Sequence, residues 1–141
     1  MTSLVLDASV IIKWYVPEDD FLAARSLRTP DMHFAAPDLL FVEFSNILWK
    51  LVRRGEIDQA RAARAVSEVI AAPWVIHANR SLARDALDLA VAAGISAYDA
   101  SYVALAMRLD TICVTADQKL VRKLEGTPSF DHVRLLADYT N

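Results

Sequence analysis

The side chains with the clearest chemical potential in this sequence are four carboxylates: Asp7, Glu43, Asp99 and Asp117. Asp7 and Asp117 each follow a short apolar run with the pattern of a buried strand. Glu43 and Asp99 lie in segments with helical periodicity, on faces shared with apolar residues three or four positions away. A carboxylate on a packed face costs several kcal/mol unless it is paired, protonated or bound to a metal. All four therefore need a physical explanation.

Each carboxylate taken alone also has a purely structural explanation. Asp7 and Asp117 each precede a predicted helix, and aspartate is a favoured N-cap. Glu43 could border the core and reach water. Asp99 lies three residues after Ser96, which is the spacing of a capping box, and a carboxylate in the first turn suits the helix dipole. These explanations stay open for each residue.

Taken together, the four carboxylates indicate a divalent cation. Carboxylates within ~4 Å of one another repel by about 4 kcal/mol per pair at an effective dielectric constant of 20, so a cluster persists only if some members are protonated or a cation bridges them. Oxygen donors without cysteine or paired histidine favour Mg²⁺ or Mn²⁺ over Zn²⁺. Such an ion binds substrate phosphate and makes water acidic, which suits hydrolysis of a phosphodiester. The three histidines lie outside these segments, so a histidine general base is not indicated: His33, His77 and His132.

The elements that must position these residues alternate along the chain. We expect helices over 8–16, 18–27, 38–54, 58–72, 81–93, 96–109 and 117–124, and strands over 4–6, 33–36, 74–77, 111–115 and 132–135. Asp38 is expected to cap the helix that follows it. The strands are continuously apolar, which is typical of a parallel sheet covered by helices on both faces. In such α/β folds ligands bind beyond the carboxyl ends of the strands, where Asp7 and Asp117 are expected.

Length and composition limit the possible classes of protein. The chain has 141 residues, of which 55% are hydrophobic, so we expect one globular domain over 1–141. The net charge of −3 does not indicate a nucleic-acid-binding protein, and a polyanionic substrate would need a bound cation or a local basic patch. The single cysteine, Cys113, excludes an internal disulfide and is expected to be buried. We find no signal-peptide pattern and no apolar run of ~18 residues, so we expect a soluble cytoplasmic protein.

Four segments of the chain resemble, in the same order, the motifs of PIN-domain ribonucleases. They are Leu4 to Ser9, Pro37-Asp38 with Glu43 to Asn46, Tyr98 to Ala100, and Val114 to Asp117. The resemblance covers about residues 3 to 136. The chain also has the size of the VapC-type toxins of bacterial and archaeal toxin–antitoxin pairs.

This resemblance implies a PIN-like three-layer α/β/α sandwich with a central parallel sheet. It also implies endonuclease action on RNA, a Mg²⁺ or Mn²⁺ site formed by the four carboxylates, a homodimer, and inhibition by a VapB-type antitoxin. Ser9 and Thr115 match hydroxyl positions near the family's site. Asp7, Glu43 and Asp99 would hold the ion, and Asp117 would bind a second ion or orient the attacking water.

Basic side chains fall in two groups. One group shares a helix face near the last carboxylate: Lys119, Arg122 and Lys123. It could grip the RNA backbone, or it could be a solvated basic face. The other group ends the helix over 38–54: Lys50, Arg53 and Arg54. We interpret this second group structurally, because cations suit a helix C-terminus.

Large apolar side chains gather near the first two predicted helices, at 14–16 with Phe21 and Leu22. They could form a groove for an antitoxin helix, or they could pack in the core. Either role is compatible with the sequence.

Other α/β proteins with an acidic magnesium site fit the sequence less well. A HAD-type phosphatase has a second aspartate two residues after the first, where this chain has Ser9. A receiver domain of two-component signalling has paired acids after the first strand and a lysine after a late strand, where this chain has Asp117. Two alternatives to an RNA-cleaving enzyme stay open: a non-cleaving PIN-like scaffold that binds RNA or protein, and a Mg²⁺-binding receiver-like signalling domain.

Overall fold

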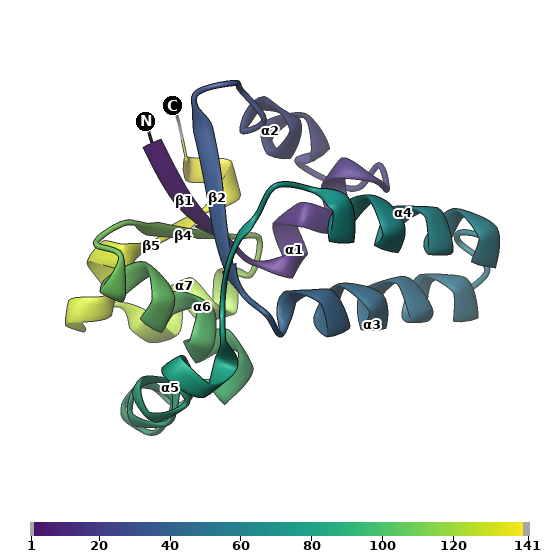
Figure 1. Cartoon of the computed structure of the whole chain (residues 1–141). Coiled ribbons are helices and arrows are strands. Elements are labelled where there is room, and N and C mark those ends of the chain that lie inside the picture. Colours follow the sequence, from purple (N-terminus) through teal and green to yellow (C-terminus); the bar gives the residue numbers. More distant parts are fainter. Residues whose placement is uncertain (1, 140–141) are drawn as a thin grey trace.

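A central sheet of five parallel strands organises the computed structural model, which describes residues 2–139 (Figure 1). The strands are β1 (Thr2–Leu6), β2 (Met32–Pro37), β3 (Val75–His77), β4 (Ile112–Thr115) and β5 (Val133–Leu135). Their order across the sheet is β3-β2-β1-β4-β5. The chain therefore builds outward from β1 on one side, then crosses over to β4. The crevice between β1 and β4 is the switch point where folds of this kind bind ligands.

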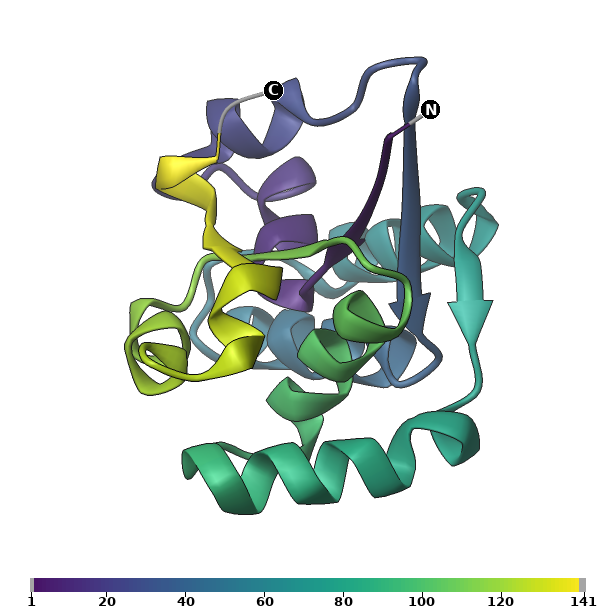
Figure 2. The same ribbon diagram turned by 90° about the vertical axis from the view of Figure 1, so that its left-hand side faces the viewer.

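Helices cover both faces of this sheet (Figures 1 and 2). They are α1 (Ala8–Ile11), α2 (Phe21–Ser26), α3 (Leu40–Arg53), α4 (Gln59–Ala71), α5 (Asn79–Ala93), α6 (Ala97–Arg108) and α7 (Gln118–Leu124), with 3₁₀ turns η1 (Ile12–Trp14), η2 (Pro128–His132) and η3 (Leu136–Asp138). Leu4 and Leu6 of β1 pack in a core with α1, α3 and α4, whereas Val5 packs in a second core with α6 and α7. Successive side chains of a strand point to opposite faces, so these two cores confirm the predicted three-layer α/β/α sandwich.

The predicted elements are all present, and their starts and ends differ by a few residues from those expected. The helix expected over 8–16 ends as a 3₁₀ turn at Trp14. The helix expected from residue 18 begins only at Phe21, because Asp20 has a left-handed backbone (φ 63°). Asp38 was expected to cap α3, and this expectation is wrong. Its Oδ1 accepts the backbone N–H of Asn79 (2.9 Å), and Asn79 Oδ1 accepts the N–H of Leu39 (3.2 Å). These two bonds join the starts of α3 and α5.

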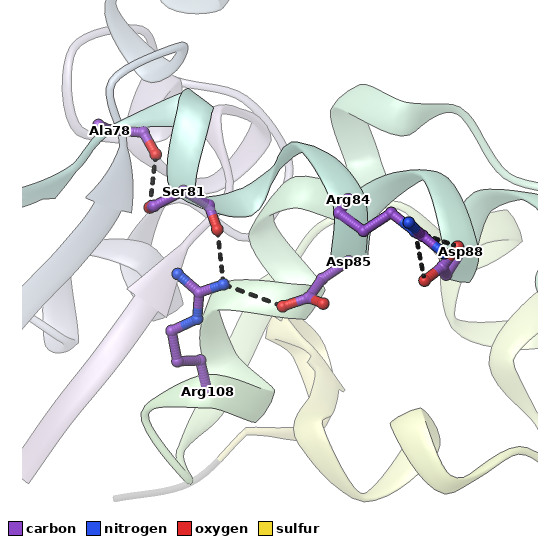
Figure 3. A network of polar contacts seen from close by, with 6 residues as sticks. All are labelled: Ala78, Ser81, Arg84, Asp85, Asp88 and Arg108. Atoms are coloured by element: carbon purple, nitrogen blue, oxygen red, sulfur yellow. Dashed lines mark hydrogen bonds and ion pairs between the residues drawn. The ribbon is translucent and has the colours of Figure 1, made fainter.

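The pair α5 and α6 packs side by side and is fastened by an exposed polar network (Figure 3). Arg108, near the end of α6, donates to the carbonyl of Ser81 (2.6 Å) and to Asp85 (2.9 Å) on α5. Exposed ion pairs contribute little stability, about 0–1 kcal/mol each, and this one joins α5 to α6, the helix that carries Asp99 in its first turn.

Two further expectations concern burial and membrane insertion. Cys113 is buried in β4 as a free thiol, as predicted. Among residues 2–139, no single helix is long and apolar enough to cross a membrane; only α5 and α6 taken together, across a bend of 112°, have the required length and composition.

Candidate active site

All four predicted carboxylates line one pocket of about 390 Å³ at the carboxyl end of the sheet. Asp7 follows β1 and Asp117 follows β4, and these strands are neighbours in the sheet. Glu43 comes from α3 and Asp99 from α6, which cover opposite faces. Four segments far apart in the sequence therefore meet at the crevice that the strand order predicts.

Asp7 is the most buried of these carboxylates. Its Oδ2 accepts the hydroxyl of Thr115 (2.8 Å) and its Oδ1 accepts the backbone N–H of Ser9 (3.4 Å). Burial raises the pKa of Asp7 to about 6; the Thr115 hydrogen bond opposes this rise and the charge of Asp99 adds to it. The side chain is thus held in place while its charged form stays poorly solvated.

The two predicted hydroxyl residues connect the ends of β1 and β4. Ser9 Oγ accepts the N–H of Ala116 (3.1 Å). Thr115 Oγ1, besides donating to Asp7, accepts the N–H of Asp117 (3.1 Å). Both hydroxyls therefore fix the backbone that presents the two strand-end carboxylates.

Glu43 is half-buried and has one close partner, the phenol of Tyr102. The hydroxyl of Tyr102 on α6 donates to Glu43 Oε2 (2.8 Å). Burial raises the pKa of Glu43 to about 7; the Tyr102 hydrogen bond lowers it, and the charges of Asp7 and Asp99 raise it. By sequence alone, Tyr102 is one of the residues that share a helix face with Asp99, which lies three positions before it. The available signal was that a buried tyrosine needs a hydrogen-bond partner for its hydroxyl.

Asp99 and Asp117 combine a structural position with access to the pocket. Ser96 Oγ accepts the N–H of Asp99 (3.1 Å), so Ser96 caps α6 as predicted. Burial and then the charge of Asp117 raise the pKa of Asp99, while Ser96 and Lys123 lower it. Asp117 caps α7, because its Oδ1 accepts the N–H groups of Lys119 (2.9 Å) and Leu120 (3.3 Å). The capping explanation thus holds for Asp117, whose side chain also lines the pocket.

The donors that line the pocket are oxygen atoms of carboxylates, a hydroxyl and an amide, with no cysteine or histidine. Within residues 2–139, no group of three histidine, cysteine, aspartate or glutamate side chains lies in an arrangement that could hold a metal ion. The carboxylates instead surround an open, polar space. None of the three histidines lines it.

The predicted basic group after Asp117 separates into two parts. Lys119 and Arg122 line a neighbouring pocket of about 720 Å³ that also includes Asp117. Lys123 Nζ instead donates to the carbonyl of Gly94 (3.1 Å). Lys50, which was expected only to suit the C-terminus of its helix, lines the carboxylate pocket.

Asn46 lines the same wall of the carboxylate pocket and was also missed. The spacing of Glu43, Asn46 and Lys50 by three and four positions was the available signal, because such residues share one helix face.

The apolar group near the first helices is mainly core. Trp14 is buried, its indole N–H donates to the carbonyl of Ala24 (2.8 Å), and its ring packs near Phe34 and Trp74. Of the residues proposed for an antitoxin groove, Leu22 is the most open, at 68% exposure. The core-packing alternative therefore explains Trp14.

Comparisons with known proteins identify the family of this chain. The PIN domain family model matches residues 4–125. The chain is 34% identical over 126 residues to Ribonuclease VapC3 of Pyrobaculum aerophilum, a match that covers 85% of this chain and 93% of that protein. It is 35% identical over 88 residues to Exonuclease VapC9 of the same organism, covering 62% and 65% of the two chains.

Solved structures share the fold. The crystal structure of PAE2754 from Pyrobaculum aerophilum matches with a TM-score of 0.68 at 26% identity, covering 96% of this chain and 85% of that one. A toxin–antitoxin complex from Klebsiella pneumoniae contains a chain that matches with a TM-score of 0.60 at 14% identity, covering 94% and 97%, which is a likeness of fold alone. The family model spans most of the chain, and the VapC3 match extends over nearly the whole of that relative, so this chain belongs to the PIN-domain family as one of its VapC-type members.

Proposed function

We propose that this protein is a Mg²⁺- or Mn²⁺-dependent endoribonuclease that acts as the toxin of a toxin–antitoxin pair. The observation that carries the proposal is the convergence of four carboxylates in one polar pocket, three of them with raised pKa values. Such desolvated, mutually repelling carboxylates are stabilised by a divalent cation. The ribonuclease name of the VapC3 relative supports RNA as the substrate.

The residues in the pocket fit Mg²⁺ or Mn²⁺ in their chemistry. Mg²⁺ prefers oxygen donors, keeps several waters, and binds through one or two carboxylates together with substrate phosphate. A preformed ring of three ligands is therefore not required. Asp7, Glu43 and Asp99 would hold the ion, with Asp117 beside them. When bound, a divalent ion lowers the pKa of water and offsets the charge that develops on a phosphate during hydrolysis.

The chain's own residues supply positioning. Thr115 and Ser9 fix Asp7, and Tyr102 fixes one oxygen of Glu43. Asp117 is held by its capping bonds and would orient the attacking water or contact a second ion. Lys119 and Arg122, in the adjoining pocket, would contact the RNA backbone. Preorganised groups of this kind avoid reorganisation during the reaction.

A homodimer and a VapB-type antitoxin are the proposed partners. The structural neighbour from Klebsiella pneumoniae belongs to a toxin–antitoxin complex, which supports an antitoxin. Leu87 and Val91 on α5 are four positions apart and are 55% and 77% exposed, which supports a protein contact at that face. We also propose that the protein acts in the cytoplasm.

The test is cleavage of a structured RNA by the purified chain in Mg²⁺, Mn²⁺ or EDTA. We expect cutting with either metal and none in EDTA. Glu43→Gln should abolish cutting, whereas Glu56→Gln, which removes the same charge at an exposed position outside the pocket, should not. Cleavage that persists in EDTA would contradict the metal mechanism. Tight RNA binding without cutting in any metal would favour the non-cleaving scaffold.

A further inference from the structure

One face of α3 carries three different polar groups into or beside the carboxylate pocket: Glu43, Asn46 and Lys50. Residues three, four and seven positions apart lie on the same side of a helix. At a rise of 1.5 Å per residue, the backbone positions of Glu43 and Lys50 are about 10 Å apart along the helix axis. The face therefore passes from a carboxylate through an amide to an ammonium over two turns.

Lys50 differs from the other cations near the site. It is the one cation among the described residues that line the carboxylate pocket. It is exposed, and within residues 2–139 the structure gives it neither an ion pair nor a hydrogen bond from its side chain. By contrast, Lys123 is bonded to Gly94, and the guanidinium of Arg53 lies 4.9 Å from the Trp49 ring centre.

Within residues 2–139, Lys50 forms no ion pair with any of the four carboxylates. The charges that shift the pKa of Glu43 are those of Asp7 and Asp99, and those that shift the pKa of Asp99 are Asp117 and Lys123. An exposed ammonium that does not pair with carboxylates in the same pocket is available to an anion from outside. The anion must extend from the carboxylates toward Lys50, past an amide that can donate hydrogen bonds.

We propose that Lys50 and Asn46 form a subsite for a phosphate of the RNA strand next to the one that is cut, with Lys50 as its charged contact. This inference rests on the proposed function, because the cut phosphate must lie at the carboxylates. A nucleic acid backbone is the ligand that carries repeated anionic groups along a chain. The subsite would position the strand and would take no part in the bond-breaking step.

The experiment measures RNA affinity without cleavage, with every protein carrying Asp99→Asn and Mn²⁺ present. Lys50→Met keeps the apolar stem and removes the charge. We expect it to weaken binding of a fluorescent RNA about tenfold, because the variant loses one charge-assisted contact to a phosphate. The slope of log affinity against log salt should fall by about 0.7, the value for one contact to a single strand. Lys50→Arg should restore most of the affinity.

Arg54→Met is the matched control, since it removes one positive charge at the end of the same helix but outside the carboxylate pocket. It should change the affinity less than twofold and leave the slope as it was. In the otherwise unmodified protein, Lys50→Met should raise KM with little change in kcat, and should leave the rise in Tm caused by Mn²⁺ unaltered.

The outcomes separate this subsite from the proposed function. An RNA affinity within twofold of the parent and an unchanged salt slope for Lys50→Met would overturn the subsite while the enzyme still cuts RNA. Equal losses of RNA affinity for Lys50→Met and Arg54→Met would overturn the subsite too, because they would show a general electrostatic attraction of RNA to the basic end of α3. If the unmodified protein neither binds nor cuts RNA, the proposed function itself fails.

Discussion

The carboxyl end of the central sheet carries a polar pocket lined by carboxylates, whereas the amino end carries a packed aromatic cluster. At the carboxyl end, Asp7 and Asp117 follow β1 and β4 and line a polar pocket with two further carboxylates. At the amino end of β2 and β3, Trp14, Phe34 and Trp74 pack together beside an apolar pocket of about 480 Å³. The ring centres are 5.5–5.9 Å apart, within the range of favourable aromatic pairs.

The two ends also differ in how well their polar atoms are stabilised by hydrogen bonds or by solvent. In the aromatic cluster, each indole N–H has a carbonyl partner: Trp14 donates to Ala24 (2.8 Å) and Trp74 to Val69 (2.9 Å). In the acidic pocket, burial raises the pKa of three carboxylates, so their charged forms are stabilised less than in water. The aromatic end stabilises the fold, and the acidic end gives up stability that a ligand can restore.

The largest expected effect is on catalysis, from Asp99→Asn. This change keeps the shape and removes one charge from the cluster, so we expect RNA cleavage to fall by orders of magnitude. Without metal, relief of repulsion should raise Tm by several degrees for a gain of about 1 kcal/mol. Mn²⁺ should then raise Tm less than in the parent, because ligand binding to the native state is what stabilises it. Thermal melts with and without Mn²⁺ and one cleavage assay test this. A variant that melts lower, responds normally to Mn²⁺ and still cuts would refute Asp99 as a ligand.

The aromatic end should give the opposite result. Trp14→Ala removes a buried ring from the cluster, and such changes cost about 3–5 kcal/mol, so Tm should fall steeply. The rise in Tm caused by Mn²⁺ should persist, because Trp14 does not line the acidic pocket. Urea unfolding gives the stability, and melts at saturating Mn²⁺ give the metal response. Loss of the metal response in a folded variant would show that the two ends are coupled.

The comparison also shows what the sequence could predict. Short, mainly apolar segments between the predicted helices located the strands, and the alternation with helices predicted the sandwich. Parallel strands present ligand sites at their carboxyl ends, and this rule predicted that Asp7 and Asp117 lie near each other, as they do in the structure. Glu43 and Asp99 followed from their apolar helix faces. These inferences needed only local patterns and one general rule of topology.

What the sequence did not reveal depends on contacts between distant segments. Tyr102 and Glu43 are 59 positions apart and meet only when α3 and α6 cover opposite faces of the sheet. Asp38 bonds to Asn79 rather than capping its own helix because α5 starts beside it. Lys50 lies near the end of α3 on the same helix face as Glu43, but that shared face becomes informative only when the fold brings the other three carboxylates to the same pocket. Local sequence patterns do not predict the partner of a side chain when that partner comes from a distant segment.

A moderate effect is expected from Tyr102→Phe, which tests whether the acidic end is preorganised. The change keeps the buried ring and removes the hydroxyl that bonds Glu43. Since a hydrogen bond to a charged group contributes about 1.5–3 kcal/mol, we expect Mn²⁺ affinity to fall about tenfold by calorimetry. The pKa of Glu43 should rise further, because the hydroxyl lowers it, and the activity profile should shift toward alkaline pH. Unchanged affinity with an unchanged profile would make Tyr102 a packing residue alone.

The last expected effect is the dependence of Tm on pH in the metal-free protein. Asp7 and Glu43 have folded pKa values of about 6 and about 7, above their ordinary values of 3.8 and 4.5. Between about pH 4 and 7 the folded state therefore binds more protons than the unfolded chain, and these groups make stability fall as pH rises. The double variant Asp7→Asn, Glu43→Gln lacks both titrating groups, so it should not show this loss of stability. The Tm of the parent should therefore fall relative to that of the variant from pH 5 to pH 8.

Saturating Mn²⁺ should reverse this trend, because the ion competes with protons for the same oxygens. The rise in Tm that Mn²⁺ causes should therefore grow from pH 5 to pH 8 in the parent and stay small in the double variant. Trp14→Ala, in the aromatic cluster, should lower Tm by similar amounts at every pH, since no titrating carboxylate lines its pocket. A parent whose metal-free Tm relative to the double variant does not depend on pH would show that the carboxylates are already solvated, and the contrast between the two ends of the sheet would be lost.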